Sequence, residues 1–187
     1  MAKRTRHQGH DKYKTRIKHL FSIYSENPNT ETQAEDAKYL AVLVSGYLEQ
    51  AIKEVLLEYS SSTSAPNVSK YIKDSWPTSR NMNVENIKNI LKQFNEEWAD
   101  KFSDWLVEHN GLNGCEQGST KRKSVKKADR KSDVNTIVSW RNYIAHGQES
   151  KTTNVTLVSV KEKFNTINEL VAFIEGLVKP KQTEANL

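Results

Sequence analysis

Two side chains of this sequence, Arg141 and His146, are suited to acid–base chemistry on a phosphate. A histidine exchanges protons near neutral pH, whereas an arginine keeps its charge and its planar guanidinium binds two phosphate oxygens at once. Cleaving a phosphodiester without a metal needs a base, an acid and positive charge around the phosphorus. The pair therefore suggests phosphoryl chemistry, with Arg141 stabilising negative charge and His146 moving the proton.

Apolar residues at three- and four-residue spacing predict that both side chains end an amphipathic helix over residues 133–146. Gly147 follows as the expected left-handed cap. The spacing puts Arg141 on the packed face of this helix, where a guanidinium needs an anionic partner. We expect Glu49, on another long helix, to be that partner. The stripe comprises Val134, Ile137, Val138, Arg141, Ile144 and Ala145.

The five-residue spacing does not bring the pair onto one helical face. In an ideal helix, residues five apart are separated by about 7.5 Å along the axis and about 140° around it. Either the helix unwinds at Gly147, or a second copy of the helix completes the site. Purely structural roles are also open, because a basic residue and a histidine at a helix end both interact favourably with the terminal carbonyl groups.

The segment around the pair resembles the Arg-x4-His signature of the HEPN superfamily, and especially its RiboL-PSP branch. The resemblance lies in residues 141–147, Arg-Asn-Tyr-Ile-Ala-His-Gly. It implies an all-α, HEPN-like helical bundle that forms a two-fold dimer. It also implies metal-independent endoribonuclease activity, in which the 2′-hydroxyl attacks at a composite dimer site and leaves 2′,3′-cyclic phosphate ends. By the same analogy, Asn142 orients His146 or the scissile phosphate.

The family resemblance leaves several biological roles open: a toxin, an RNA-processing factor or an antiviral effector, with an inhibitory antitoxin or another regulatory partner. The toxin branch that is paired with small nucleotidyltransferases carries a tyrosine two residues after the histidine, where this chain has Gln148. Regulation through that tyrosine is therefore not expected. The alternative function is a non-catalytic helical RNA-binding or protein-interaction module. A weaker third possibility is an enzyme acting on a small phosphorylated ligand.

Helical periodicity extends over most of the chain and predicts one domain from residue 13 to 179 without a substantial sheet. Residues 154–158 alternate briefly like a strand, but no other segment offers them a sheet partner. Capping boxes starting at Thr30 and Ser159 predict two helix starts. The expected helices cover about residues 13–27, 30–59, 67–76, 84–94, 96–109, 133–146 and 159–178.

Positive charge is concentrated in two segments of a chain whose net charge is only +5. Residues 1–20 carry seven Lys and Arg against one Asp, and residues 113–131 carry seven against two acidic residues. This pattern favours a polyanion such as RNA, although solvated loops would look the same. We expect a disordered basic arm at 1–12, with His10 exposed, a basic loop at 110–131 and a tail at 180–187. The expected RNA-binding residues are Lys121, Arg122, Lys123, Lys126, Lys127 and Arg130.

Several other functional classes are not expected from the sequence. Cys115 is the only cysteine, and the histidines do not cluster at metal-ligand spacing, so neither a metal site nor a cofactor is predicted. Nucleotide and zinc motifs are absent. The longest apolar run is too short for a membrane span, and the basic N-terminal segment is not followed by an apolar stretch. Cytoplasmic residence is the default expectation.

Overall fold

The computed structural model describes residues 9–77, 81–108 and 129–179. Within these ranges the chain forms seven α-helices and one 3-10 helix, and no strand, so the predicted all-α class is confirmed. Residues 154–158 do not form a strand; their last two residues begin a helix. The helices are α1 (Gly9–Ser25), α2 (Thr30–Thr63), α3 (Pro66–Asp74), α4 (Val84–Phe94), α5 (Glu96–Glu108), α6 (Arg130–Ala145) and α7 (Leu157–Val178), with η1 (Glu149–Lys151) between the last two.

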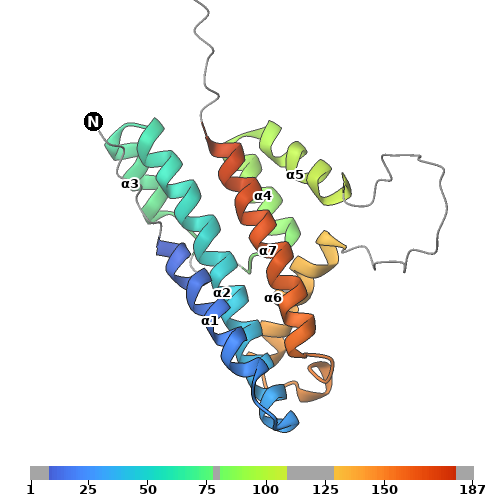
Figure 1. Ribbon diagram of the computed structural model, residues 1–187. Helices are drawn as coiled ribbons and strands as arrows, with labels where there is room; N and C mark the ends of the chain where they lie inside the picture. Colours follow the sequence, from blue (N-terminus) through green and yellow to red (C-terminus); the bar gives the residue numbers. More distant parts are fainter. Residues whose placement is uncertain (1–8, 78–80, 109–128, 180–187) are drawn as a thin grey trace, which may run out of the picture.

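The long helix α2 is the centre of the bundle, and α1, α6 and α7 all pack along it (Figure 1). Helix α3 returns against the end of α2, while α4 and α5 form a pair that contacts α6. The core is apolar because the inward positions of α2 recur at helical spacing and meet matching stripes on its neighbours. On α2 these buried residues are Ala37, Leu40, Ala41, Val44, Tyr47, Leu48, Ala51, Ile52, Val55 and Leu56.

Aromatic residues of α5 belong to this core. Trp98, Phe102 and Trp105 are all buried, as their helical spacing predicted. Trp105 stacks on Phe173 of α7 with ring centres 5.4 Å apart. Buried side chains of this size each contribute about 1.5–3 kcal/mol through removal of apolar surface from water. These tryptophans therefore stabilise the bundle and are not a base-stacking surface.

Helix α1 begins at Gly9, four residues earlier than expected. His10 is only 1% exposed, so the expectation that it lies in solvent was wrong. Its ring nitrogens lie 3.1 Å from Glu54 of α2 and 3.1 Å from Glu175 of α7, and its backbone N–H donates to Glu54. Residues 9–12 are helical because these contacts hold the first turn against two other helices. The rest of the predicted arm, residues 1–8, lies outside the described residues.

Two helix starts differ from the predicted capping boxes. Asn29 caps α2 by accepting from the backbone N–H groups of Glu31 and Thr32. Thr156 caps α7, and its reciprocal partner is Ser159, three residues later, so the box begins three residues before the predicted one. In both cases a side-chain oxygen nearer the preceding loop satisfies the first free N–H groups.

Candidate functional site

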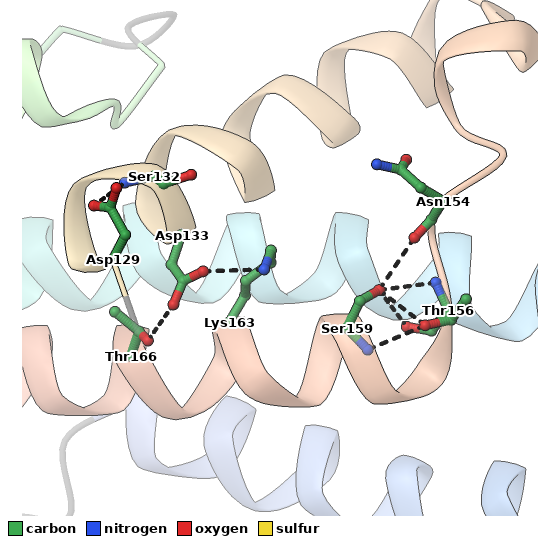
Figure 2. A network of polar contacts seen from close by, with 8 residues as sticks. All are labelled: Asp129, Ser132, Asp133, Asn154, Thr156, Ser159, Lys163 and Thr166. Carbon is green, nitrogen blue, oxygen red and sulfur yellow. Dashed lines mark hydrogen bonds and ion pairs between the residues drawn. The ribbon is translucent and has the colours of Figure 1, made fainter. Parts of the chain in front are cut away.

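The candidate site lies at the carboxyl end of α6, and α6 is fixed first at its amino end. Asp129 accepts from the backbone N–H of Ser132 at 3.0 Å, which caps the helix. Asp133, one turn further, is 8% exposed and accepts from Lys163 at 3.0 Å and Thr166 at 2.7 Å, both on α7 (Figure 2). A carboxylate this buried is stable only with such partners. The network therefore sets the position of α6 along α7.

Apolar packing continues this anchoring toward the motif. Val134, Ile137 and Val138 are buried, which confirms the first part of the predicted stripe, and Trp140 is buried as well. The ammonium group of Lys163 lies 5.6 Å from the Trp140 ring centre, so the same lysine contacts both ends of the buried face. The result is a rigid helix that delivers residue 141 and its successors to a defined place.

The end of α6 has the hydrogen bonds of a Schellman motif. His146 is the C-cap residue, and Gly147 has a φ of 63°, which confirms the predicted left-handed cap. The N–H of Gly147 donates to Ile144 at 3.1 Å, and that of Gln148 donates to Tyr143 at 2.8 Å. These bonds satisfy the last carbonyl groups and stop the helix at His146, so the backbone of that residue is fixed.

Arg141 is exposed, and its expected place on the packed face was wrong. The fully buried residues of α6 end at Trp140; in the last turn Ile144 is half-buried and still packs against the core, whereas Ala145 is exposed. The guanidinium donates to the side-chain oxygen of Asn142 at 3.2 Å and to that of Asn81 at 3.5 Å. Because Arg141 is in solvent, it needs no buried counter-charge, and the other N–H groups of its guanidinium remain available to an anion.

Glu49 does not pair with Arg141. Within the described residues, no ion pair or hydrogen bond joins them. Glu49 instead lines a cavity of about 260 Å³ with Tyr13, Lys53 and Trp76. The expected pairing assumed a buried Arg141, and that assumption fails.

His146 is exposed at the helix end, five residues after Arg141, and is not bonded to it in the described structure. Its backbone N–H donates to the carbonyl group of Asn142 at 3.0 Å. Asn142 thus contacts both members of the pair, through its side chain to Arg141 and through its backbone to His146. The imidazole is free to meet a ligand or a second copy of the chain.

Asn81 is a site residue that the sequence analysis missed. It lies in the short segment before α4, and several asparagines hold this segment in place. Asn83 caps α4 through the N–H of Asn86, whose side chain donates to the Asn81 carbonyl group at 2.7 Å. On α6, Asn135 accepts from the N–H of Val84 at 3.0 Å. The cluster of asparagines is visible in the sequence, but its contact with Arg141 depends on the packing of α4 against α6.

Arg130 is the one predicted RNA-binding residue that the structure describes, and it is held in structural contacts. Its guanidinium lies 4.1 Å from the ring centre of Trp105, donates to the Trp105 carbonyl group and pairs with Glu169 at 3.4 Å. The side chain is 12% exposed, so it joins α5, α6 and α7 and offers little to RNA. The other five, Lys121, Arg122, Lys123, Lys126 and Lys127, lie outside the described residues.

Neither a metal cluster nor a membrane-spanning helix is present in the parts of the chain that are described. No group of three His, Cys, Asp or Glu side chains in these residues is arranged to hold a metal ion. The helices described here also lack the length and apolar character that a membrane crossing requires.

The model of the RiboL-PSP-HEPN family matches residues 11–179, which include all of α2 to α7. Neither the search of curated proteins nor the search of solved structures found a match.

Proposed function

The chain belongs to the RiboL-PSP-HEPN family, and from this premise we propose that it is a metal-independent endoribonuclease with Arg141 and His146 at its centre. One observation carries the proposal. Arg141 and His146 are both exposed at the carboxyl end of a helix whose amino end is hydrogen-bonded to α7 through the buried Asp133. A fixed helix end that presents an exposed imidazole and a guanidinium without a carboxylate partner among the described residues suits transition-state stabilisation better than a purely structural role.

The proposed reaction is a transesterification. The 2′-oxygen attacks the adjacent phosphorus as a base removes its proton, and the bond from phosphorus to the 5′-oxygen breaks as an acid protonates that oxygen. The products are a 2′,3′-cyclic phosphate and a free 5′-hydroxyl group. Arg141 would neutralise the charge that builds on the phosphoryl oxygens, and His146 would carry a proton. Asn142 would hold the Arg141 guanidinium in orientation.

A second copy of the chain would supply the second proton carrier. Each chain has one Arg141–His146 pair, whereas the reaction uses both a base and an acid. A two-fold dimer that brings two α6 ends together would place two histidines and two arginines around one phosphate. The exposure of residues 141 and 145–147 leaves the end of α6 uncovered in a single chain, as this arrangement requires.

The biological role would be that of a toxin, an RNA-processing factor or an antiviral effector, with an inhibitory or regulatory partner as a further proposal. The alternative function, a helical RNA-binding or protein-interaction module without chemistry, would use the same exposed helix end.

The test is cleavage of a mixed pool of single-stranded and transfer RNA in the presence of EDTA. Wild type should produce 2′,3′-cyclic phosphate ends. His146→Ala should lose at least about 10²-fold in rate, the lower range for acid–base catalysis. Arg141→Lys, which keeps the positive charge but lacks the planar guanidinium that binds two phosphate oxygens, should also lose activity. His19→Ala is the matched control, because His19 is also exposed on a helix.

Two further measurements complete the test. Circular dichroism checks that each variant is folded, and sedimentation equilibrium reports whether the active species is a dimer. Equal cleavage by wild type and His146→Ala would refute the assignment of the histidine. RNA binding without cleavage by any variant would favour the binding module.

A further inference from the structure

A groove runs along α6 beside the motif. It has a volume of about 530 Å³ and extends from the first turn of α6 to Tyr143, the third residue of the motif. Lys151 of η1 and Asn154 of the following loop form its other wall. Tyr143 precedes His146 by three residues, about one helical turn, so a molecule at this end of the groove would lie next to His146. Arg141 does not line the groove, because it lies about 160° around the helix from Tyr143.

The groove has the polar character of a site for a phosphate-bearing ligand. Lys131 and Lys151 bring ammonium groups to it, and Thr136 and Ser139 line it between them on α6. Among the described residues that line it, the only carboxylate is that of Asp129, which already accepts a hydrogen bond from the first turn of the helix. The described lining therefore has a net positive charge, which attracts phosphate groups.

Two of the lining groups are free to contact a ligand. Lys131 is exposed and makes no ion pair with another described residue. Figure 2 shows the backbone carbonyl group of Asn154 directed at Ser159, while its side-chain amide points away from that network. An amide of this kind can both donate to and accept from a base edge or a ribose hydroxyl group.

An aromatic ring lies at the end of the groove nearest the motif. The Tyr143 ring is half-buried, and the ammonium group of Lys151 lies 4.8 Å from its centre. Proteins bind unpaired nucleotides by combining cationic groups for the backbone with aromatic rings for the bases. Lys151 provides the cationic group and Tyr143 the aromatic ring, side by side at this end of the groove.

We propose that this groove binds single-stranded RNA next to the bond that is cleaved. The assignment rests on the proposed function, because it takes the strand to pass from the groove to His146. Lys131 and Lys151 contact phosphate groups of the strand, and Tyr143 and Asn154 contact the nucleotide nearest the motif. The volume lies within the roughly 300–1,000 Å³ range of small-ligand sites, so the groove accepts a short stretch of one strand and not a duplex.

The test measures binding separately from cleavage. All proteins carry His146→Ala, so that a fluorescently labelled single-stranded RNA of eight nucleotides stays intact, and anisotropy gives Kd at several salt concentrations. The groove variant carries Lys131→Glu and Lys151→Glu. Its matched control carries Lys70→Glu and Lys73→Glu, two exposed lysines of α3, so that both variants have the same net charge.

The groove variant should raise Kd at least tenfold. It should also reduce the slope of log K against log salt by about 1.4, because each phosphate contact on a single strand contributes about 0.7. The control should bind within about twofold of the parent protein although its net charge changes equally, because Lys70 and Lys73 lie on α3 and do not line the groove. A duplex of the same sequence should bind more weakly than the single strand. If the reversed charges disturb folding, Lys131→Gln with Lys151→Gln removes the same contacts without repulsion.

Equal weakening by the groove variant and the control would overturn the proposal, because total charge and not the groove would then govern binding. A mononucleotide that competes as well as the RNA would also overturn it, in favour of a small phosphorylated ligand. A change in sedimentation of the groove variant with unchanged RNA affinity would assign the groove to contact between copies. Selective weakening by the groove variant, together with no RNA cleavage by the wild-type protein, would retain the groove and refute the nuclease. Cleavage by wild type together with unchanged binding by the groove variant would support the nuclease and overturn the RNA-binding groove.

Discussion

Replacing Gly147 by alanine tests whether the left-handed cap fixes the end of α6. Gly147 has a φ of 63°, and no atom lies within 4 Å of the position that an added Cβ would take. The substitution therefore introduces no collision with a neighbouring residue. Any loss of stability must come from the backbone conformation itself.

The magnitude follows from two opposing contributions. A non-glycine residue in the left-handed region costs about 1–2 kcal/mol. Alanine also restricts the unfolded chain, which returns about 0.4–1 kcal/mol. The free energy of unfolding of Gly147→Ala should therefore fall by about 1 kcal/mol, and Tm by about 2–4 °C for a chain of this size. Gly147→Asn should lose less, because asparagine adopts this conformation more readily.

Gly46→Ala is the matched control, because it makes the same chemical change with the opposite expected sign. Gly46 lies in the middle of α2, and its Cβ position also has no atom within 4 Å. Alanine in a helix interior should raise the free energy of unfolding by about 0.5–1 kcal/mol. Urea denaturation followed by circular dichroism gives both values. If Gly147→Ala proves as stable as the wild type, the cap does not hold the helix end.

Three further predictions concern contacts around the bundle and the site. Asp133→Ala should lower the free energy of unfolding by about 3 kcal/mol in urea, because it leaves Lys163, only 16% exposed, without its carboxylate. Burial raises the pKa of Glu54, but hydrogen bonds from Gln50 and His10 outweigh it, and the net effect lowers that pKa below 4.5. The carboxylate therefore stabilises the fold fully above pH 4.5, and this stabilisation is lost as the pH falls through the lower pKa of the folded state. Glu54→Gln should make the free energy of unfolding depend less on pH on the acid side, as measured from about pH 3 to pH 7. Asn81→Ala should lower kcat for RNA cleavage about two- to fivefold without changing KM, because it removes one weak hydrogen bond to Arg141, and Asn81→Asp should retain activity. The first prediction fails if Asp133→Ala is as stable as the wild type; the second fails if the two pH profiles are parallel, and the third if KM changes instead of kcat.

Local sequence patterns predicted the helices well because caps, periodicity and breakers act within a few residues. Gly147 is the clearest example: the glycine directly follows the apolar stripe of α6, and its positive φ confirms the expected cap. The capping positions of α2 and α7 were shifted because several oxygen-bearing side chains stood close together, and the loop geometry selected among them. Thr156 and Ser159 illustrate this competition.

Tertiary contacts explain what the sequence could not predict. Periodicity predicted that Arg141 lies on the apolar stripe, but it could not show that this position is exposed although Trp140 is buried and Ile144 packs against the core. His10 looked like part of a charged arm, and only the meeting of α1 with Glu54 and Glu175 explains its burial. Asn81 reaches Arg141 across 60 positions of the chain, a separation that no local pattern can detect.

The arrangement of α2 beside α7 has a consequence for the order in which the protein folds during synthesis. Tyr47 donates a hydrogen bond to Asn168, 121 positions later, and His10 reaches Glu175, 165 positions later. Part of the apolar face of α2 therefore stays uncovered until α7 has been synthesised, and contacts this distant in sequence form slowly. The motif helix α6 leaves the ribosome before the helix that anchors Asp133 does. A nascent chain would thus carry Arg141 and His146 without the support that fixes them, and we expect activity to arise only once α7 has been made.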